Sequence, residues 1–292
     1  MTTSARERVA AFWDDHTARW LRGEDPMPTP LAAWFDSYQG VGSGTPTRDG
    51  FPEPYHGDLL GREHTPRMVV LGLNPGEYRP QFQSRDGIFA REIKEKYGSY
   101  SRWQTTYPYN RPPWTDIIGR NRYYQARLTF TRNWLQDPEA DHRDLLIFES
   151  YPWHSKLITG PLRPPAEIID AFVWQPIAEL PVGEVFAFGR PWDSLAQALR
   201  LPVVSMLGAG GRHYGSAVPS RAVRVYGLPS GQLLVVEWHA GSAGPPSAKE
   251  TALLRSVLTG VLNSADDAPP RPRVAGSSGA APTAATAGRS SS

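Results

Sequence analysis

The chain has 292 residues and carries 31 lysines and arginines against 29 aspartates and glutamates, a net charge of +2. This balance gives no overall basic field of the kind that attracts nucleic acid. Because cysteine is absent, the sequence excludes disulfides, thiolate zinc sites, cysteine nucleophiles and iron–sulfur clusters. No apolar run reaches the roughly 20 residues of a membrane helix, and the polar start has no signal-peptide core, so we expect a cytoplasmic protein without a membrane partner.

Apolar periodicity and turn residues divide the chain into predicted elements. Residues 4–23 are an expected helix because Val9, Trp13 and Trp20 fall on one face. A loop rich in proline and glycine follows over 40–66. Strands are predicted at 67–73, 144–150, 184–189, 201–207, 222–227 and 232–238, and helices at 86–97, 121–136, 165–179, 191–200 and 247–262.

The order of these elements predicts the fold class. The first three strands alternate with long, partly helical connections, which favours parallel pairing through right-handed crossovers. The turn LPSG between the last two strands favours a hairpin. We therefore expect an α/β protein, a three-layer α/β/α sandwich with a central, mostly parallel sheet. A single domain over 1–262 would carry a helix-and-loop extension at 1–66, and the tail 263–292 would be disordered because it has no aromatic residue and one large aliphatic, Val274.

The predicted strands end in polar or small residues. The apolar run Val69–Leu73 stops at Asn74-Pro75-Gly76, and the next strand ends in Glu149-Ser150. Carboxyl ends of parallel strands meet at one edge of a sheet, where open α/β folds bind ligands, so we expect a pocket there. The alternative is that Asn-Pro-Gly is a turn chosen for its shape alone.

One segment, 94–134, differs from the rest of the chain. It holds eight lysines or arginines, two acids and ten aromatic residues. Basic residues bind phosphates, and aromatic rings between them stack on bases. Alternatively, the segment is helical, with a solvated basic face and with its aromatic rings in the core. This alternative explains most of the aromatic rings better than it explains the arginines.

Three other patterns fail their own requirements. The sequence AGSAG at 240–244 is similar to a serine nucleophile elbow, but no histidine follows Ser242. The sequence GAGG at 208–211 would need glycine, not His213, to complete a dinucleotide turn. No two histidines have metal-ligand spacing, so we expect no metal or other cofactor. Four of the seven histidines, His16, His56, His64 and His142, are interpreted as ordinary surface or packing residues.

Four other short segments, taken in their order along the chain, resemble the conserved motifs of the uracil-DNA glycosylase superfamily. They are GLNPG (72–76), FESYP (148–152), FGRPWDSLA (188–196) and HAGSAGPPSAK (239–249). The resemblance is strongest to the single-strand-selective monofunctional and the mismatch-specific enzymes, and it covers about residues 67 to 260 as short, individually weak matches. It implies an α/β/α sandwich with DNA crossing the carboxyl edge of the sheet.

The resemblance also implies two catalytic residues. Asn74 falls on the family residue that holds the hydrolytic water or positions the sugar. Its side-chain carbonyl would accept from water while its amide is held elsewhere. His239 falls on the loop histidine that donates a hydrogen bond to the departing base, a stabilisation that is typically worth about 10²–10³ in rate.

Further residues are assigned by the same resemblance. Phe89 would stack on the extruded base, with Tyr78 and Phe82 competing for that role, and Gly72 and Pro75 would frame the base pocket. The segment from Gly241 to Pro246 would enter the DNA helix where the base left. The residues expected to contact DNA are Arg190, Arg212 or His213, Ser242 and Lys249. Arg120 and Arg122 are added to them from the basic segment 94–134.

Two departures from the family pattern carry information. The final loop has lost the first proline of the family sequence H-P-S-P. The position of the family's uracil-reading asparagine holds Glu149. An ionised glutamate accepts hydrogen bonds only and repels a carbonyl, which suits the amine of a cytosine-type base. If burial keeps Glu149 protonated, it donates and the preference reverses; alternatively, Glu149 pairs with an arginine and reads no base.

The expected function is therefore a monofunctional DNA glycosylase that leaves an abasic site, acts on a modified or cytosine-type base rather than plain uracil, and serves repair or defence against modified foreign DNA. No lysine occupies a matched catalytic position, so no lyase step is expected. We expect DNA as the partner and a monomer. Two alternatives remain, a module that binds a modified base without cleaving it and an unrelated hydrolase of small nucleosides.

Overall fold

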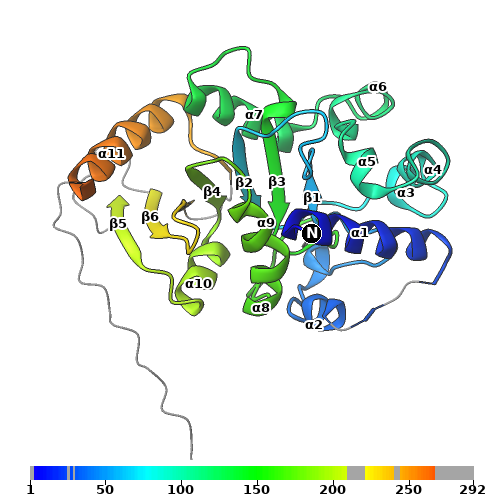
Figure 1. Cartoon of the computed structure of the whole chain (residues 1–292). Coiled ribbons are helices and arrows are strands. Elements are labelled where there is room, and N and C mark those ends of the chain that lie inside the picture. The colour runs from blue at the N-terminus through cyan, green and yellow to red at the C-terminus, as the bar shows by residue number, and fades with distance from the viewer. Residues whose placement is uncertain (1–2, 25–26, 29, 209–220, 240–243, 267–292) are drawn as a thin grey trace, which may run out of the picture.

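A seven-stranded mixed sheet organises the computed structural model, which describes residues 3–24, 27–28, 30–208, 221–239 and 244–266 (Figure 1). The strand order is β1-β3-β2-β4-β7-β6-β5. β2 pairs in parallel with β3 and β4, and β4 with β7, whereas β1, β6 and β5 pair antiparallel. The strands are β1 (Tyr55–His56), β2 (Met68–Gly72), β3 (Leu145–Glu149), β4 (Glu184–Phe188), β5 (Val203–Gly208), β6 (Arg221–Gly227) and β7 (Leu233–His239).

Eleven α-helices are described, several of them a single turn. The predicted helix at 86–97 is α4 followed by a π-helix at Glu92–Tyr97, and the one at 165–179 is interrupted by a second π-helix, Asp170–Trp174. The helices are α1 (Ala5–Leu21), α2 (Leu31–Asp36), α3 (Pro80–Gln83), α4 (Ile88–Arg91), α5 (Tyr100–Gln104), α6 (Trp114–Ile117), α7 (Arg122–Leu135), α8 (Ala166–Ile169), α9 (Gln175–Ala178), α10 (Arg190–Ala198) and α11 (Ala248–Asp266).

Helices cover both faces of the parallel core. From β2 the chain crosses to β3 on one side, and from β3 it passes beyond β2 to β4 on the other, so right-handed crossovers put the two connections on opposite faces. On one face, Phe130 and Trp134 of α7 pack on Phe186 with ring centroids 4.9 and 4.5 Å apart, and α11 packs against α7. On the other, Trp174 packs on Trp192 of α10. The expected α/β architecture is confirmed.

The β2 strand is the centre of this core. All five of its residues are buried, as the continuous apolar run predicts for a strand covered on both faces. The last carbonyl of the strand, on Gly72, accepts from the buried indole of Trp192 at 3.0 Å and from the Ser150 amide at 3.1 Å. The end of β2 is thereby fixed to both the neighbouring strand and the helical layer.

Residues 1–66, which were expected to form an extension of helices and loops, contribute to the sheet and to the helical layers. β1 lies inside the proline-rich loop and pairs with Phe148 and Ile147 of β3, so this segment belongs to the sheet. α1 packs against α5 and α9, which makes it part of the fold as well. The helix α11 continues to Asp266, four residues into the expected disordered tail; residues 267–292 lie outside the described part of the chain.

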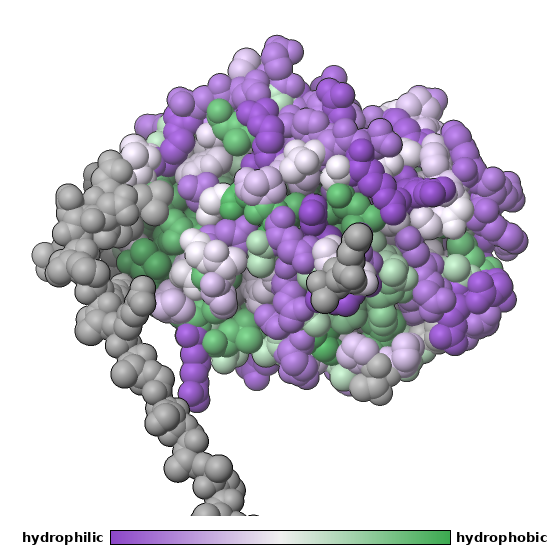
Figure 2. Space-filling model, in the orientation of Figure 1, coloured by the Kyte–Doolittle hydropathy of each residue, from purple (hydrophilic) through white to green (hydrophobic). Residues whose placement is uncertain are grey.

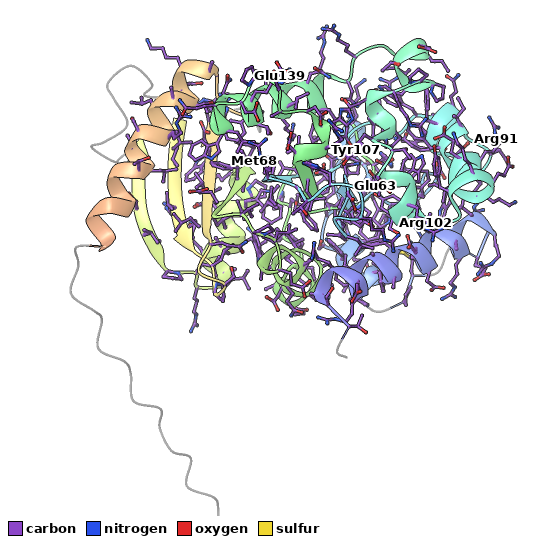
Figure 3. The ribbon with its side chains drawn as sticks, turned by 45° about the horizontal axis from the view of Figure 1, so that its top comes forward. Glu63, Met68, Arg91, Arg102, Tyr107 and Glu139 are labelled. Atoms are coloured by element: carbon purple, nitrogen blue, oxygen red, sulfur yellow. The ribbon has the colours of Figure 1, made fainter. Side chains whose placement is uncertain are left out.

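Figure 2 shows hydrophobic patches scattered among hydrophilic side chains on one face. Figure 3 shows Arg91, Arg102 and Glu139 at the periphery and Met68, at the start of β2, inside the molecule. Across the described residues, none of the helices combines the length and the apolar character needed to cross a bilayer.

The Trp192 indole gives a stability prediction. Trp192→Phe removes the hydrogen bond to Gly72 and part of the buried ring, and should lower the free energy of unfolding by about 1–3 kcal/mol. Trp192→Ala should cost about 3–5 kcal/mol, measured by urea denaturation. As a control, Val41→Ala at a side chain that is 74% exposed should change stability by less than about 0.5 kcal/mol; equal losses in all three variants would contradict the role of Trp192.

Candidate functional site

The carboxyl ends of four parallel strands form one edge of the sheet. Gly72 is the register partner of Glu149, and Phe188 is that of Glu237, while Leu71 is level with Ala187. The connections that leave β2 and β3 run to opposite faces of the sheet. Their carboxyl ends therefore flank a crevice of the kind in which open α/β sheets bind ligands.

The segment after β3 holds the loop after β2. The Tyr151 amide donates to the Leu73 carbonyl at 3.0 Å. The Asn74 side-chain amide donates to the carbonyl of Ser155 at 2.7 Å and to its hydroxyl at 3.0 Å. The other side-chain atom of Asn74, Oδ1, has no hydrogen bond to a described residue, and the side chain is half-buried. Asn74 thus presents an acceptor from a fixed amide plane.

An open pocket of about 380 Å³ lies beside this loop. Its volume is within the range of small-molecule sites. Glu77 at its rim pairs with Arg79 at 3.2 Å and with Lys156 at 3.3 Å. The pocket is lined by Pro75, Gly76 and Glu77, by the arginines Arg79, Arg120 and Arg122, and by aromatic rings that include Tyr109, Trp114 and Tyr123.

Two of these arginines are available for an anionic ligand. Arg120 and Arg122 are exposed, and neither forms an ion pair with a described residue. Most other arginines of the basic segment 94–134 are already engaged. Arg111 pairs with Glu92 at 2.7 Å, and Arg127 is buried with its guanidinium 3.3 Å from the ring centroid of Tyr123. Within the segment 94–134, the positive charge that lies at the pocket and is free of an acidic partner comes mainly from Arg120 and Arg122.

Glu149 lies beneath the pocket and does not line it. Its side chain is fully buried, and its Oε1 accepts from the Tyr123 hydroxyl at 2.5 Å. Burial raises the pKa of Glu149 to about 8, against the opposing charge of Arg127. The carboxyl is therefore mostly protonated at pH 7, and its second oxygen, Oε2, has no hydrogen-bond partner among the residues that the structure describes.

A second buried acid, Glu53, stands next to it. The Tyr109 hydroxyl donates to both of its oxygens, at 2.5 and 2.7 Å. His56 lies between the two acids, with Nδ1 3.6 Å from Glu53 and Nε2 3.8 Å from Glu149. Burial lowers the pKa of His56 to about 4, so this ring is neutral at physiological pH.

Four residues of this site were missed in the sequence, namely Glu53, His56, Tyr109 and Tyr123. His56 was interpreted as an ordinary surface or packing residue; the structure buries it between two acids, at 3.6 Å from Glu53 and 3.8 Å from Glu149. A signal existed in FPEPYH (51–56), where an acid and a histidine stand among prolines and aromatic residues. In the structure the aromatic residues and both ionisable residues of this segment, Phe51, Tyr55, Glu53 and His56, are buried.

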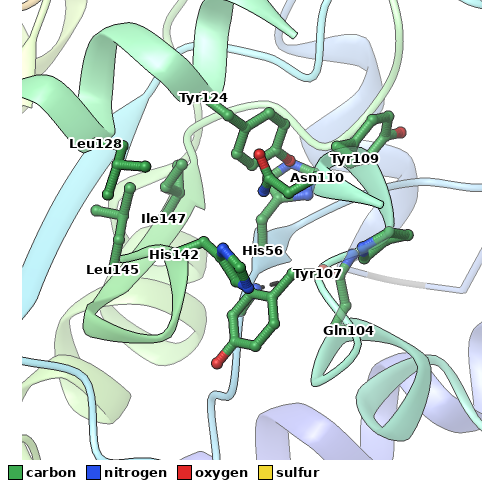
Figure 4. Close-up of a pocket in the computed structure, with 12 residues that line it drawn as sticks. His56, Gln104, Tyr107, Tyr109, Asn110, Tyr124, Leu128, His142, Leu145 and Ile147 are labelled. Atoms are coloured by element: carbon green, nitrogen blue, oxygen red, sulfur yellow. Dashed lines mark hydrogen bonds between the residues drawn. The ribbon is translucent and has the colours of Figure 1, made fainter. Parts of the chain in front are cut away.

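A second, much smaller cavity lies next to the pocket. It measures about 20 Å³, enough for roughly one water molecule and far too small for a base. Figure 4 shows the rings of His56, Tyr107, Tyr124 and His142 arranged around it. His56, Tyr109 and Tyr124 line both spaces and form the wall between them.

His239 ends β7 at the same edge as Asn74. β4 lies between β2 and β7, so with strands 4.7–4.9 Å apart the two strand ends are roughly 10 Å from each other. Nearby, the buried carboxyl of Glu237 accepts from Arg221 at 2.8 Å, and burial raises its pKa to about 7 despite that arginine. The two predicted catalytic residues thus share one edge of the sheet, while their chemical roles stay predictions.

The expected base-stacking role of Phe89 needs correction. Its side chain is fully buried, with ring centroids of Phe82, Trp103 and Trp114 at 4.9, 5.0 and 5.9 Å. Neither of its faces borders the open pocket. Phe82, considered for the same role, is equally buried, because both rings complete the aromatic core that the helices α3 to α6 share.

Two other base-binding assignments change as well. Gly72 does not border the pocket, since a Cβ added there would lie 2.1 Å from the Tyr123 hydroxyl and 2.3 Å from Glu149 Oε2. Glu149 is separated from the pocket by Tyr123, so direct reading of a base by Glu149 is not what this arrangement provides. Pro75 does line the pocket, whereas Tyr78 packs half-buried beside His154 at 6.2 Å between centroids.

The remaining predicted contacts to DNA are at the surface or outside the described chain. Arg190 is exposed at the start of α10, and Lys249 is exposed in the first turn of α11. Arg212, His213 and Ser242 lie outside the described residues, as does the first half, 241–243, of the segment that was expected to enter the DNA helix. No group of three or more metal-ligating side chains occurs within the described residues.

The raised pKa of Glu149 makes stability depend on pH. A carboxyl whose pKa rises from 4.5 to about 8 on folding takes up a proton between those values, so stability falls as pH rises across that window. Glu149→Gln, which mimics the protonated acid, should reduce this fall by at most about 1.4 kcal/mol per pH unit. Urea unfolding at pH 5, 6.5 and 8 measures it, with exposed Glu139→Gln as control; parallel curves for wild type and Glu149→Gln would contradict the burial of an acid here.

No family model, curated protein or solved structure matches the chain. The resemblance to the uracil-DNA glycosylase superfamily therefore stays an expectation from the short sequence segments, and function has to be inferred from the site itself.

Proposed function

We propose that the protein is a monofunctional DNA glycosylase that hydrolyses the N-glycosidic bond of a nucleobase flipped out of DNA and leaves an abasic site. The observation that carries the proposal is Asn74, whose side-chain amide is held by Ser155 while Oδ1 has no hydrogen bond to a described residue. This is the orientation that a water-holding asparagine requires. Asn74 does not line the pocket itself, but the next two residues, Pro75 and Gly76, do.

The pocket chemistry suits a nucleotide. Aromatic rings such as Trp114 and Tyr123 offer apolar surface to a base, and Arg120 and Arg122 at the rim suit backbone phosphates. An everted nucleotide presents those two chemistries together, a flat base and an adjacent anion. A small apolar substrate would use the rings and leave the arginines without a role.

The reaction needs little nucleophilic strength. Asn74 cannot remove a proton from water completely, so the proposal requires a transition state with oxocarbenium character, in which bond breaking is ahead of water attack. His239 at the same edge donates to the departing base as negative charge develops on it. The proposal includes no Schiff base, because the described residues that line the pocket do not include a lysine.

The preference for a cytosine-type base, which was expected from the sequence, is not part of this proposal. That preference depended on an ionised Glu149, and burial instead raises its pKa to about 8. The acid also contacts Tyr123 rather than the open pocket. The proposal therefore covers an everted nucleobase in DNA, without selection by Glu149 for an exocyclic amine.

The second candidate is a module that binds a modified base without cleaving it. Two observations favour it. The Tyr123 hydroxyl and the Glu149 carboxyl fill the space next to Gly72, and burial raises the pKa of Glu149 so that this carboxyl is not ionised at pH 7. Both candidates predict DNA binding, and they differ in whether a base is released.

Base release decides between them. Purified protein is incubated with single- and double-stranded oligonucleotides that each carry one altered base, followed by alkaline cleavage and base analysis. Wild type should release one base or a small set of bases, and Asn74→Ala should lower the rate by at least about 10²-fold while DNA affinity is kept. Binding without release of any base would favour the module, and an undiminished rate in Asn74→Ala would exclude the proposed role of this residue.

The arginines at the rim give an independent prediction. The double variant Arg120→Ala/Arg122→Ala should weaken binding to all oligonucleotides and reduce the slope of log affinity against log salt by about 1.5–2. Arg8→Ala/Arg91→Ala removes two exposed arginines from α1 and α4 and serves as the matched control. Equal slopes for the two double variants would place the DNA elsewhere.

A further inference from the structure

Two large apolar side chains are exposed at the mouth of the pocket. Ile117 and Ile118 are 46% and 38% exposed, and Ile118 is part of the pocket lining. They stand at the end of α6, a short helix at the periphery of the molecule (Figure 1). Single exposed apolar side chains are common on protein surfaces, whereas an adjacent pair at the mouth of a pocket fits a contact site for what the pocket receives.

The pair is held by the aromatic core below it. Residues three and four positions apart share one face of a helix, so Ile117 and Ile118 continue the apolar face that begins at Trp114. Trp114 is buried, and its ring packs on Tyr109 and Phe82 with ring centroids 4.7 and 4.8 Å apart. The two isoleucines therefore project from a helix that the core fixes in place.

Positive charge follows directly after the pair. Gly119, with φ +87°, ends the helix in the left-handed conformation that glycine adopts readily. Arg120 and Arg122 come next, both exposed and both at the pocket, and no ion pair joins either of them to a described residue. An apolar tip beside two cations matches duplex DNA, whose stacked bases are apolar and whose backbone is anionic.

The loss of a nucleotide from the base stack creates a need for such a tip. An everted nucleotide leaves a gap, and unstacking its neighbours costs free energy. Proteins that deform DNA offset this cost by inserting apolar side chains, isoleucine among them, between base steps. Because Ile118 borders the pocket proposed to receive the base, the side chains that can fill the gap lie next to the place to which the base moves.

The segment expected from the sequence to enter the DNA is less suited to it where the structure describes it. Of residues 241–246, the described ones are 244–246, and among these Pro245 is half-buried and Pro246 is buried. A buried proline cannot enter DNA without leaving its own packing. The isoleucine pair, more than 100 residues earlier in the chain, is already at the surface.

We propose that Ile117 and Ile118 form a wedge that enters duplex DNA at the position from which the everted nucleotide has left the stack. The inference deepens the proposed function and, for its effect on rate, rests on it. Insertion itself requires a gap in a base stack and does not require that the glycosidic bond is cleaved.

The first test measures insertion without any reaction. A duplex with one tetrahydrofuran abasic analogue has no base for the pocket, so tighter binding to it than to the intact duplex reports the filling of the gap. The wild type should prefer the analogue by at least about 10-fold. Ile117→Ser/Ile118→Ser should lose this preference and keep its affinity for the intact duplex, because Arg120 and Arg122 remain.

Two double variants serve as controls. Ile117→Leu/Ile118→Leu keeps an apolar tip and should keep the preference. Val203→Ser/Val204→Ser removes two adjacent side chains of β5 that are 52% and 42% exposed, and should also keep it. A wild type without the preference, or a serine variant of the isoleucine pair that retains it, would overturn the wedge. Retention together with dissociation of a dimer, seen by light scattering, would assign the pair to a protein interface instead.

The second test follows base release. Ile117→Ser/Ile118→Ser should slow release from a duplex by about 10-fold, and should slow release from the same single strand far less because a single strand has no continuous stack to fill. Equal losses on both substrates would contradict the wedge. If the wild type releases no base, the proposed function fails, whereas the preference for the abasic analogue still decides whether the wedge exists.

Discussion

The hydrogen bonds between the segment after β3 and the turn after β2 determine the geometry of the whole candidate site. They run from Tyr151 to Leu73, from Asn74 to Ser155, and from His154 to Gly76. They form because β2 and β3 are parallel neighbours in register and end at the same level. A one-residue shift between these strands would separate all of these partners and turn the buried side chains of one strand to the wrong face. The apolar packing of β2 against both helical layers is what prevents such a shift.

Ionisable groups gather at this edge although burying them is costly. Glu53, Glu149 and Glu237 are each at most 1% exposed, and their environments move their pKa values in different directions. Glu53 keeps its charge beside a histidine and a tyrosine, whereas burial raises the pKa of Glu149 to about 8 and of Glu237 to about 7. At a purely structural position, an apolar residue of similar size would stabilise the fold as well as a buried acid does, or better. Such a concentration of perturbed acids at the strand ends is typical of a functional site.

The sequence predicted the features that depend on local pattern. The six long strands were located to within two residues of their observed ends because continuous apolar runs are bounded by turn residues, and the antiparallel pairing of β6 and β7 was expected from LPSG. Asn74 was identified because its turn interrupts a buried strand. The features that depend on tertiary packing were not predictable in this way. β1 has two residues and no periodicity, and Phe89 was assigned to a ligand although the aromatic core needed it. The contact between Tyr123 and Glu149 joins residues 26 positions apart on different layers, which no local pattern reveals.

The central claim is that one nucleotide of bound DNA enters the pocket beside Asn74. The most direct test is a crystal structure of the protein with a short single-stranded oligonucleotide whose central nucleotide has a non-hydrolysable glycosidic bond. The account predicts the sugar of that nucleotide next to Asn74 Oδ1, its base against Trp114 or Tyr123, and its phosphates at Arg120 and Arg122. DNA bound on another face, with the pocket empty and Asn74 far from any sugar, would contradict it.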